Sequence, residues 1–298
     1  IGAVMEHLEE AGIHSGDSTC FIPTQNISEE MIERVKIQTR NIGLGLGIKG
    51  CYNIQFAIQG DNLYCLEVNP RSSRTVPFVA KATGVPMAKI AAKVTLGINL
   101  SQQEIPEATS GHVAVKAPVF PFIKLQGLDP APGPEMKSTG EVYGSDLRAD
   151  VAYLKARLAT EIPVAKSGGA YLTVRDEDKE NLVPIAEKLQ NLGFTLYATP
   201  GTSDTLRANN LEVQTVYRIA ERQHPDALDL MRKGEVSFIV NVPTISGGAV
   251  RDGNMMRRLA VEMNIPFVTT MSGAAMEVAA IKAGMELEIQ PMRLTVNY

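Results

Sequence analysis

Two short segments near residue 60 alternate between polar and apolar residues. YNIQFAIQ covers 52–59 and LYCLEVN covers 63–69, with GDN at 60–62 between them. Such alternation around a short glycine-containing segment predicts a β-hairpin, here with a three-residue loop that places Gln55 opposite Glu67. The apolar even-numbered positions then share one face: Ile54, Phe56, Ile58, Tyr64, Leu66 and Val68. A slip by one residue would turn the apolar face of the second strand away from that of the first.

Helical periodicity flanks the predicted hairpin. Residues 28–43 predict a helix that has Ser28 as its N-cap, and residues 84–97 predict a second helix. Between the first helix and the hairpin, GLGIKG (45–50) matches the pattern G-x-G-x-x-G. A dinucleotide site requires a strand before these glycines and a helix after them, whereas here the order is reversed. We therefore interpret the glycines as the end of the helix and the turn into the hairpin.

Two further segments of the first half show no such period. The first twelve residues, IGAVMEHLEEAG, resemble the middle of a helix, so we expect the chain to be a piece of a longer protein. Residues 117–136 are rich in proline, which removes a backbone donor. This second segment is therefore predicted to be irregular or to lie at a sheet edge, and not to form a central strand.

The pattern changes after about residue 162, where short apolar runs alternate with helical segments. The predicted strands occupy 170–175, 195–199, 213–218, 236–242 and 266–270. The predicted helices occupy 178–193, 227–234, 253–264 and 273–284, and SDTLRANN follows the second strand. Strict alternation of this kind predicts a five-stranded parallel sheet that is covered on both faces. We therefore expect an α/β protein with two domains, residues 1–162 and residues 163–298.

Composition narrows the class of protein. The chain has 298 residues and a net charge of −4, so it has no basic field of the kind that binds nucleic acid. Its three cysteines, Cys20, Cys51 and Cys65, have no C-x-x-C spacing, which argues against a disulfide framework and favours a reducing compartment. No apolar run approaches 18 residues, the length that would indicate a membrane helix. We expect a soluble cytoplasmic protein that binds neither nucleic acid nor membrane.

Polar side chains converge at the end of the predicted hairpin. Gln55, Glu67 and Asn69 share the odd-numbered face, and Arg71 and Arg74 follow the second strand. A carboxylate with amide oxygens suits Mg²⁺, and neighbouring guanidinium groups suit an anionic substrate. On spacing alone, a solvated strand face is an equally good interpretation. The two arginines directly after the carboxylate favour a binding site.

In the second half, polar residues gather where the predicted strands end. Ligands of open parallel sheets bind beyond the carboxyl ends of the strands, and helix N-termini there favour phosphate. The residues at these positions are Thr173, Lys179, Thr199, Gly201, Thr202, Arg218, Asn241, Thr269 and Thr270. Each of them alone is an ordinary loop residue, but together they predict one phosphate-binding rim.

The residues also carry a family resemblance. NIQFAI, LEVNPRSSRTVPFVAKATGVPMAKIAAKV, HSGDS (14–18) and GPEMKSTGEV (133–142) resemble the second ATP-grasp unit of the carbamoyl-phosphate synthase large subunit family. The likeness covers residues 1 to 162 and implies part of an ATP-grasp domain, with α+β architecture and an antiparallel sheet. The second half resembles the Rossmann-like, methylglyoxal-synthase-like domain that regulates members of that family.

The first resemblance implies roles for individual residues. It implies that Gln55, Glu67 and Asn69 hold Mg²⁺ or Mn²⁺, that His14, Ser15, Gln55 and Glu67 contact ATP, and that Arg71 and Arg74 hold the transferred phosphoryl group. Without the family, His14 would be interpreted as an ordinary loop histidine. The implied reaction phosphorylates carbamate with ATP, in pyrimidine and arginine biosynthesis, and K⁺ is a further implied cofactor. The family's N-terminal and lid subdomains would precede Ile1, so we expect no synthase activity from this chain alone.

The second resemblance implies regulation. Lys179, Thr199, Thr202 and Arg218 match positions that hold a nucleotide phosphate, and Thr173 and Asn241 match contacts to the ribose or base. UMP as inhibitor and IMP are the implied effectors. Some relatives bind ornithine, but Ala117 and Phe267 replace two of those contacts here, which argues against ornithine although Glu9 and Asp17 are retained. The implied partners are the remainder of the large subunit and a glutaminase small subunit, in an oligomer.

Three hypotheses follow. The first is the C-terminal part of the synthase, with half a catalytic site and a regulatory domain. The second is a nucleotide-sensing module in which the ATP-grasp remnant is only structural. The third, a methylglyoxal-synthase-type lyase, ranks last because residues 219–227 lack the G-G-D pattern that such a lyase needs. Intact Gln55, Glu67 and Asn69 favour the first hypothesis over the second.

Overall fold

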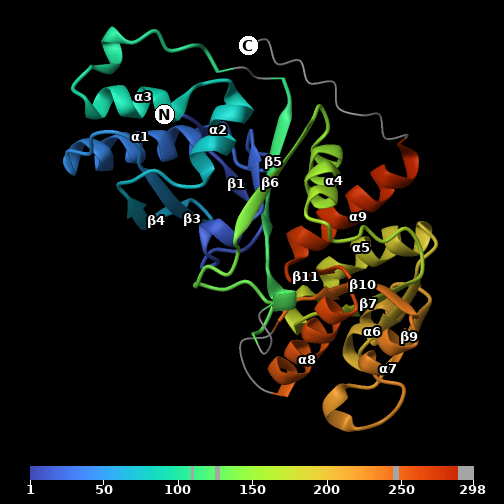
Figure 1. The fold of residues 1–298 in the computed structure, drawn as a ribbon. Helices are drawn as coiled ribbons and strands as arrows, with labels where there is room; N and C mark the ends of the chain where they lie inside the picture. Colours follow the sequence, from blue (N-terminus) through green and yellow to red (C-terminus); the bar gives the residue numbers. More distant parts are fainter. Residues whose placement is uncertain (109–110, 125–127, 244–247, 288–298) are drawn as a thin grey trace. The chain divides into compact units, whose positions relative to one another are not determined.

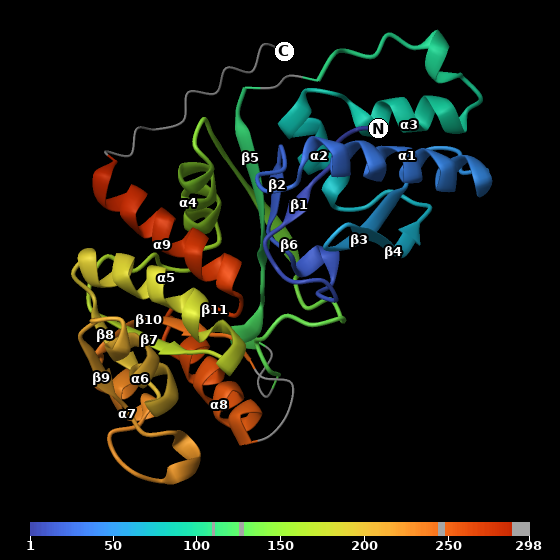
Figure 2. The ribbon, with the colours of Figure 1, turned by 180° about the vertical axis from the view of Figure 1, so that it is seen from behind.

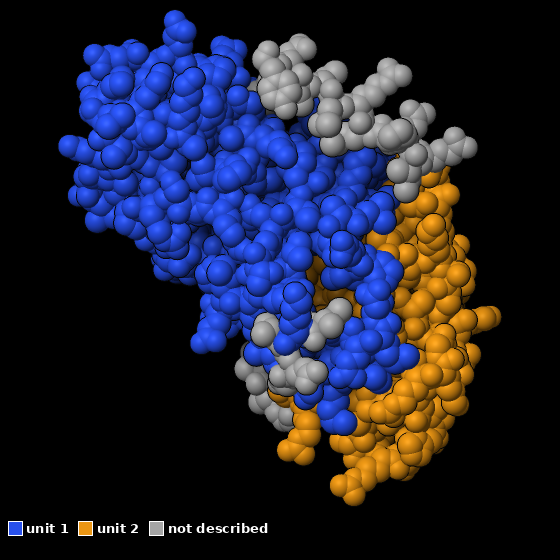
Figure 3. All heavy atoms as spheres, viewed as in Figure 1, with its two compact units in different colours: residues 1–163, 253–264 blue, residues 164–252, 265–298 orange. Residues whose placement is uncertain are grey.

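The structure is a computed structural model that describes residues 1–108, 111–124, 128–243 and 248–287. The chain divides into two compact units, which Figure 3 shows in different colours. The first unit contains residues 1–163 and 253–264, and the second contains residues 164–252 and 265–298. None of the helices in the described ranges is both long enough and apolar enough to cross a membrane.

A four-stranded antiparallel sheet organises the first unit (Figures 1 and 2). Its strands, in spatial order, are β1 (Glu6–His7), β2 (Cys20–Ile22), β5 (Val113–Val119) and β6 (Gly140–Asp146). Helix α4 (Ala149–Ala159) packs directly on β5 and β6. Gly144 permits this close contact, because a Cβ atom there would lie 2.3 Å from the carbonyl oxygen of Ala152. The antiparallel sheet expected for the first half is confirmed.

Two expectations for the first unit are wrong. Residues 1–12 do not form a helix, because Glu6 and His7 pair with β2 as a short strand and Leu8 N donates to Thr19 O at 2.9 Å. The proline-rich segment begins inside β5, which is an inner strand of the sheet. Pro118 is tolerated there because β2 pairs only with residues 114–116, so no β2 carbonyl opposite Pro118 requires a donor.

The predicted hairpin is present, and its key pair is confirmed. Strands β3 (Asn53–Gln59) and β4 (Asn62–Asn69) place Gln55 opposite Glu67. The loop, however, has two residues and not three, because Gln59 pairs with Asn62. A β-bulge after Gln55 compensates for the shorter loop. It shifts the pairs between the bulge and the loop by one residue relative to the predicted register.

The bulge also corrects the predicted apolar face. Phe56 pairs with Cys65, and Ile58 pairs with Leu63, so these side chains share a face. Tyr64 pairs with Ala57 on the other face, Leu66 is the unpaired residue of the bulge, and both are nearly half exposed, at 47% and 48%.

Both helices predicted around the hairpin are confirmed. Helix α1 (Glu29–Gly45) begins as expected, because the Ser28 side chain accepts a hydrogen bond from Met31 N. Helix α3 (Met87–Thr95) follows Pro86. The glycines after α1 lead into β3, which confirms their interpretation as a helix end and turn. Helix α2 (Thr75–Thr83) begins immediately after Arg74 and was not predicted. Single-turn 3-10 helices occupy Ser15–Asp17, Leu100–Gln102 and Phe122–Lys124.

The second unit contains the predicted parallel sheet, with all five strands confirmed (Figure 1). In spatial order the strands are β11 (Phe267–Val268), β10 (Val236–Asn241), β7 (Gly169–Thr173), β8 (Thr195–Ala198) and β9 (Val213–Thr215). Its helices are α5 (Lys179–Asn191), α6 (Pro200–Ala208), α7 (Ala227–Arg232) and α9 (Met271–Glu286), and two 3-10 turns lie at Asp176–Asp178 and Ile219–Glu221. Helix α8 (Gly248–Glu262) begins in this unit, but its residues 253–262 belong to the first unit. Leu172, Leu196 and Phe238 are almost completely buried, as expected for strands with helices on both faces.

Candidate functional site

The odd-numbered face of the hairpin brings three oxygen-bearing side chains together. Gln55 and Glu67 are directly paired, so their Cβ atoms are about 5 Å apart. Asn69 Nδ2 donates to Glu67 Oε1 at 3.0 Å and to Asn53 Oδ1 at 3.3 Å. Gln55 Nε2 donates to the carbonyl oxygen of Ile13 at 3.2 Å. Because both amide nitrogens are used in this way, the amide oxygens of Gln55 and Asn69 remain to bind a ligand.

The backbone of residues 13–17, which we call the central loop, contacts several candidate residues. Its carbonyl groups accept from Gln55 at Ile13, from Lys116 Nζ at Ser15 (3.0 Å), and from Arg74 Nη2 at Gly16 (3.3 Å). His14 and Ser15, predicted to contact nucleotide, lie on this same loop, where His14 Nδ1 accepts from Gly16 N at 2.9 Å. The structure thus brings His14, Ser15, Gln55 and Arg74 together.

The two arginines differ in their surroundings. Arg74 is half-buried, and its guanidinium contacts Ser138 and Gly16. Arg71 is exposed; its backbone N donates to Asn69 O at 2.9 Å, and its guanidinium donates to Ser72 O at 3.2 Å. The backbone of Arg71 is therefore tied to Asn69, but the hydrogen bond described for its guanidinium goes to Ser72, whereas the guanidinium of Arg74 is held against the central loop.

A cluster of ionisable groups lies on and next to the four-stranded sheet, where Lys116 contacts the central loop. Lys116 is completely buried, and its Nζ atom is 3.9 Å from Glu141 Oε2. Burial raises the pKa of Glu9 to about 7, although the Thr19 backbone N–H and Lys116 act in the opposite direction. Burial and the nearby Lys116 charge lower the pKa of His7 to about 4. The Lys116 ammonium group therefore contacts the loop that carries His14 and Ser15, and the nearby Glu9 carboxyl group changes its protonation near pH 7.

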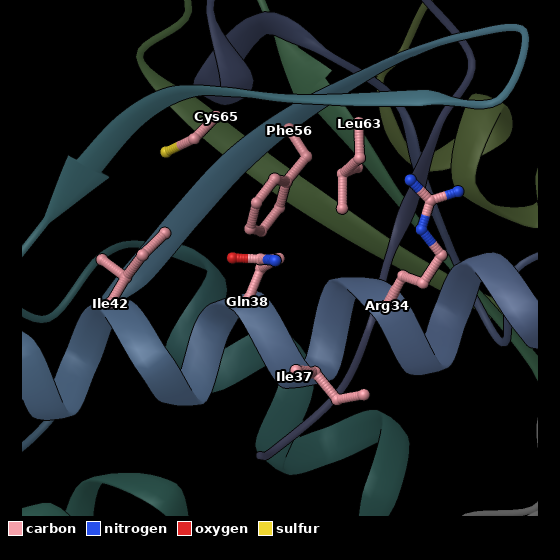
Figure 4. A pocket seen from close by; sticks show the side chains of 7 residues that line it. All are labelled: Arg34, Ile37, Gln38, Ile42, Phe56, Leu63 and Cys65. Atoms are coloured by element: carbon pink, nitrogen blue, oxygen red, sulfur yellow. The ribbon is translucent and has the colours of Figure 1, made fainter.

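A pocket of about 190 Å³ lies between α1 and the opposite face of the hairpin (Figure 4). Its lining residues are Arg34, Ile37, Gln38, Ile42, Phe56, Leu63 and Cys65. The lining positions of the hairpin point away from Gln55 and Glu67, because neighbouring residues of a strand face opposite sides. The pocket is therefore separate from the oxygen-rich face.

In the second unit, the predicted rim residues lie at the carboxyl ends of adjacent strands. Asn241 at the end of β10 is directly paired with Thr173 at the end of β7, and Asn241 is buried. Thr199 is the N-cap residue of α6, and its Oγ1 atom lies 3.4 Å from Oγ1 of the buried Thr202. Two hydroxyl groups therefore stand at a helix N-terminus, which is a favourable place for phosphate.

Lys179 reaches the same helix N-terminus. A Cβ atom at Gly201 would lie 2.6 Å from Lys179 Nζ, so the ammonium group sits directly over the first turn of α6. Lys179 Nζ also lies 2.7 Å from the exposed Asp176 carboxylate. The hydrogen bond and charge of Lys179 lower the pKa of Asp176, and the charge of Arg218 contributes in the same direction. The structure therefore places Lys179 at the N-terminus of α6, and the charge of Arg218 acts on the same Asp176 carboxylate that Lys179 contacts.

Two residues of the first unit escaped the prediction from sequence. Lys116 lies within an apolar strand, and a lysine among valines and alanines is a usable signal for a buried cation. Ser138 contacts Arg74 from a position 64 residues away along the chain, and its own sequence context carries no such signal. Asp17 is also fully buried, with both carboxylate oxygens bonded to backbone N–H groups of residues 137 and 138.

Two known protein families match different parts of the chain. Residues 3–103 match the ATP-binding domain of the carbamoyl-phosphate synthase L chain, and residues 181–269 match the MGS-like domain. The chain is thus an α/β protein that combines part of an ATP-grasp domain with a Rossmann-like, MGS-like domain.

The relatives are consistent in name. A carbamoyl phosphate synthase large chain of Methanosarcina barkeri is 47% identical over 97% of this chain and 73% of the relative. Large chains of Methanoculleus marisnigri and Methanothermobacter thermautotrophicus are 46% and 45% identical, and this chain spans only 28% and 27% of their length. The chain belongs to the carbamoyl phosphate synthase large chain family. A solved N5-carboxyaminoimidazole ribonucleotide synthetase from Thermus thermophilus is 13% identical, with a TM-score of 0.38 over 52% of this chain and 44% of that one.

Proposed function

We propose that this chain is the C-terminal part of an enzyme that phosphorylates carbamate with ATP to give carbamoyl phosphate and ADP. The observation that carries the proposal is the convergence of Gln55, Glu67 and Asn69 on one hairpin face, beside the loop that Arg74 contacts. The family membership supports the same reaction. On this proposal the chain alone is inactive, because the remainder of the large chain completes the nucleotide site.

The donor set of the hairpin fits a hard divalent cation. Glu67 offers a carboxylate, and Gln55 and Asn69 offer amide oxygens, which matches the preference of Mg²⁺ and Mn²⁺ for oxygen ligands. The amide nitrogens of Gln55 and Asn69 donate to neighbouring acceptors, which orients both oxygens for coordination. We propose that these three residues hold the metal, which when bound would neutralise charge on the ATP phosphates. We include K⁺ in the proposal without assigning its ligands.

The arginines and the central loop have a separate task. We propose that Arg74, held by backbone and hydroxyl acceptors, presents its remaining N–H groups to the transferred phosphoryl group, and that Arg71 contributes further positive charge. His14 and Ser15 would contact the nucleotide from the central loop. Phosphoryl transfer depends mainly on positioning and charge stabilisation, so fixed donors of this kind supply much of the catalysis.

The test of this proposal is Glu67→Gln in the complete large chain. The variant keeps the shape of the side chain but removes the charge that a divalent cation requires, so carbamoyl-phosphate formation should fall about 100-fold or more. Glu104→Gln, the same chemical change at another exposed glutamate of the first unit, should leave turnover unchanged. Normal turnover in Glu67→Gln would defeat the assignment and favour a nucleotide-sensing module with a structural ATP-grasp remnant.

We further propose that the rim of the second unit binds a nucleotide monophosphate, UMP or IMP, as an effector. Lys179, Arg218 and the N-terminus of α6 would bind the phosphate, with Thr199 and Thr202 donating hydroxyl hydrogen bonds. Thr173 and Asn241 would contact the ribose or base. Lys179 Nζ now lies 2.7 Å from the Asp176 carboxylate, and on effector binding it would exchange this partner for the phosphate.

Calorimetry on this chain tests the effector site. The Lys179→Ala/Thr202→Ala variant should lose most UMP affinity, whereas Lys188→Ala, at an exposed position in the last turn of α5, should not. Equal UMP affinity in the double variant and the parent would contradict the assignment of the site.

The wider proposal places the enzyme in the cytoplasm and in pyrimidine and arginine biosynthesis. Its proposed partner is a glutaminase small subunit, with which it forms an oligomer.

A further inference from the structure

We propose that Ser138 is a positioning residue for Arg74, and that the buried Asp17 fixes Ser138 in place. This inference rests on the proposed function, because it assumes that Arg74 acts on the transferred phosphoryl group. It concerns residues of the first unit only, and it assigns to Ser138 and Asp17 a role that the sequence did not predict for them.

The guanidinium of Arg74 is bonded mainly to two residues. Its Nη2 atom donates to Ser138 Oγ at 2.7 Å and to Gly16 O at 3.3 Å, and its Nη1 atom donates to Ser138 O at 3.5 Å. Met136 Sδ lies 3.3 Å from Nη2 as well. A guanidinium has five N–H donors in a fixed plane, so three bonds to oxygen on one side determine where the others point.

Ser138 is suited to this role by its own hydrogen bonds. Its Oγ atom donates to Gly16 O at 3.0 Å, so the lone pairs of the hydroxyl are directed to Arg74. The residue is only 4% exposed, so water competes little with these bonds. A hydroxyl with one proton cannot donate twice, which makes the direction of each bond unambiguous.

Asp17 explains why Ser138 stays next to the central loop. Asp17 is completely buried, its Oδ1 atom accepts from Ser138 N at 2.9 Å, and its Oδ2 atom accepts from Lys137 N at 2.7 Å. Both oxygens are therefore engaged with backbone, and hydrogen bonds to a charged acceptor are stronger than neutral ones. Lys137 Nζ in turn donates to Asp129 O and Ala131 O at 3.1 and 2.6 Å, which holds the preceding segment.

Gly16 gives independent support for a close fit between the Arg74 guanidinium and the central loop. A Cβ atom at this position would lie 2.6 Å from Arg74 Nη2, closer than a side chain can approach. Gly16 has no left-handed backbone conformation to account for a glycine here. A Cβ atom at Gly16 would therefore displace the ends of the Arg74 and Met136 side chains, so the observed position of the guanidinium depends on the absence of a side chain here.

The test is a double-mutant cycle between Ser138 and Arg74 in the complete large chain. Ser138→Ala removes the hydroxyl but keeps the N–H that Asp17 binds. We expect the kcat of carbamoyl-phosphate formation to fall about tenfold, with the KM for ATP nearly unchanged and the melting temperature preserved. In an Arg74→Lys background, which lacks the planar fork, Ser138→Ala should change kcat by less than about twofold.

The outcomes separate this inference from the proposed function. Normal turnover in Arg74→Lys alone would contradict the proposed role of Arg74, and with it the premise. A reduced turnover in Arg74→Lys, together with the same loss from Ser138→Ala in both backgrounds, would show that Ser138 acts on stability or on another group, and would overturn the inference. No loss from Ser138→Ala in the parent would overturn it as well.

Discussion

Replacing Glu9 by Gln tests the electrostatics of the buried cluster around Lys116. Burial raises the pKa of Glu9 from its ordinary value of 4.5 to about 7, against the opposing hydrogen bond from Thr19 N, 2.6 Å from Glu9 Oε2. The folded protein therefore binds this proton more tightly than the unfolded chain does. The associated stability is fully present below pH 4.5 and is lost as the pH rises through 7.

The size of the effect follows from the two pKa values. A shift from 4.5 to about 7 corresponds to about 3.4 kcal/mol in the free energy of unfolding when the titration is complete. This value is an upper limit, because Glu9 keeps part of its solvent exposure. Between pH 5 and pH 8 the two-state expression gives a change of up to about 2.5 kcal/mol. Glu9→Gln should thus become more stable than the parent by up to that amount as the pH rises from 5 to 8.

His7, in the same cluster, also titrates, so the stability of the parent must be compared with that of Glu9→Gln at each pH. The lowered pKa of His7, about 4 against an ordinary 6.5, gives stability that is present above pH 6.5 and is lost as the pH falls toward 4. In the parent the two effects oppose each other between pH 4.5 and 6.5. Because both proteins contain His7, the difference between them isolates Glu9.

The assay is urea denaturation at pH 5 and pH 8, with hydrogen exchange read on peptides from residues 1–163 so that the first unit is followed by itself. Glu30→Gln, the same change at an exposed position in the first turn of α1, provides the control. The reasoning fails if the stability difference between parent and Glu9→Gln is the same at both pH values.

Two further predictions concern the rim and a buried ion pair. Gly201→Ala should weaken UMP binding about tenfold with little change in stability, because the new Cβ atom would displace the flexible end of Lys179; unchanged affinity in calorimetry would contradict the position of that ammonium group. Asp129→Asn should lower the free energy of unfolding by about 3 kcal/mol, because the buried Arg257 loses a carboxylate 2.6 Å from its Nη2 atom. Burial acts to raise the pKa of Asp129, but the hydrogen bond from Arg257 lowers it overall. In the parent, the stability from this ion pair is therefore present above pH 3.8 and is lost as the pH falls below that value. A difference between the two proteins that does not change with pH in urea denaturation would refute this account.

Local patterns were sufficient for the second unit. Each of its strands is a short apolar run followed by helical periodicity, so the element type is encoded within about ten residues. Parallel pairing then places the strand ends together, which is why Thr173 and Asn241 could be predicted to lie at one rim.

The first unit depended more on contacts between distant segments. The sequence of residues 1–12 has the composition of a helix, but pairing of Glu6 and His7 with β2 decides their conformation. Alternation predicted that Gln55 faces Glu67, yet it could not reveal the bulge, since a two-residue loop with a bulge and a three-residue loop give the same pair. Lys116, within β5, and Ser138, just before β6, contact the central loop or Arg74 across long sequence separations, and no local pattern specifies these partners.

The central loop connects the candidate metal site to Arg74 through hydrogen bonds to its backbone. Gln55, Lys116 and Arg74 each donate to a backbone carbonyl of this loop, at residues 13, 15 and 16. Carbonyl acceptors belong to the backbone, so the arrangement depends on the shape of the loop and hardly on its side chains, with Gly16 as the exception that Arg74 requires. A change at any one donor should therefore shift the loop under the other two. For this reason Gln55 and Arg74 should show non-additive effects on turnover, although they lie on different elements of the fold.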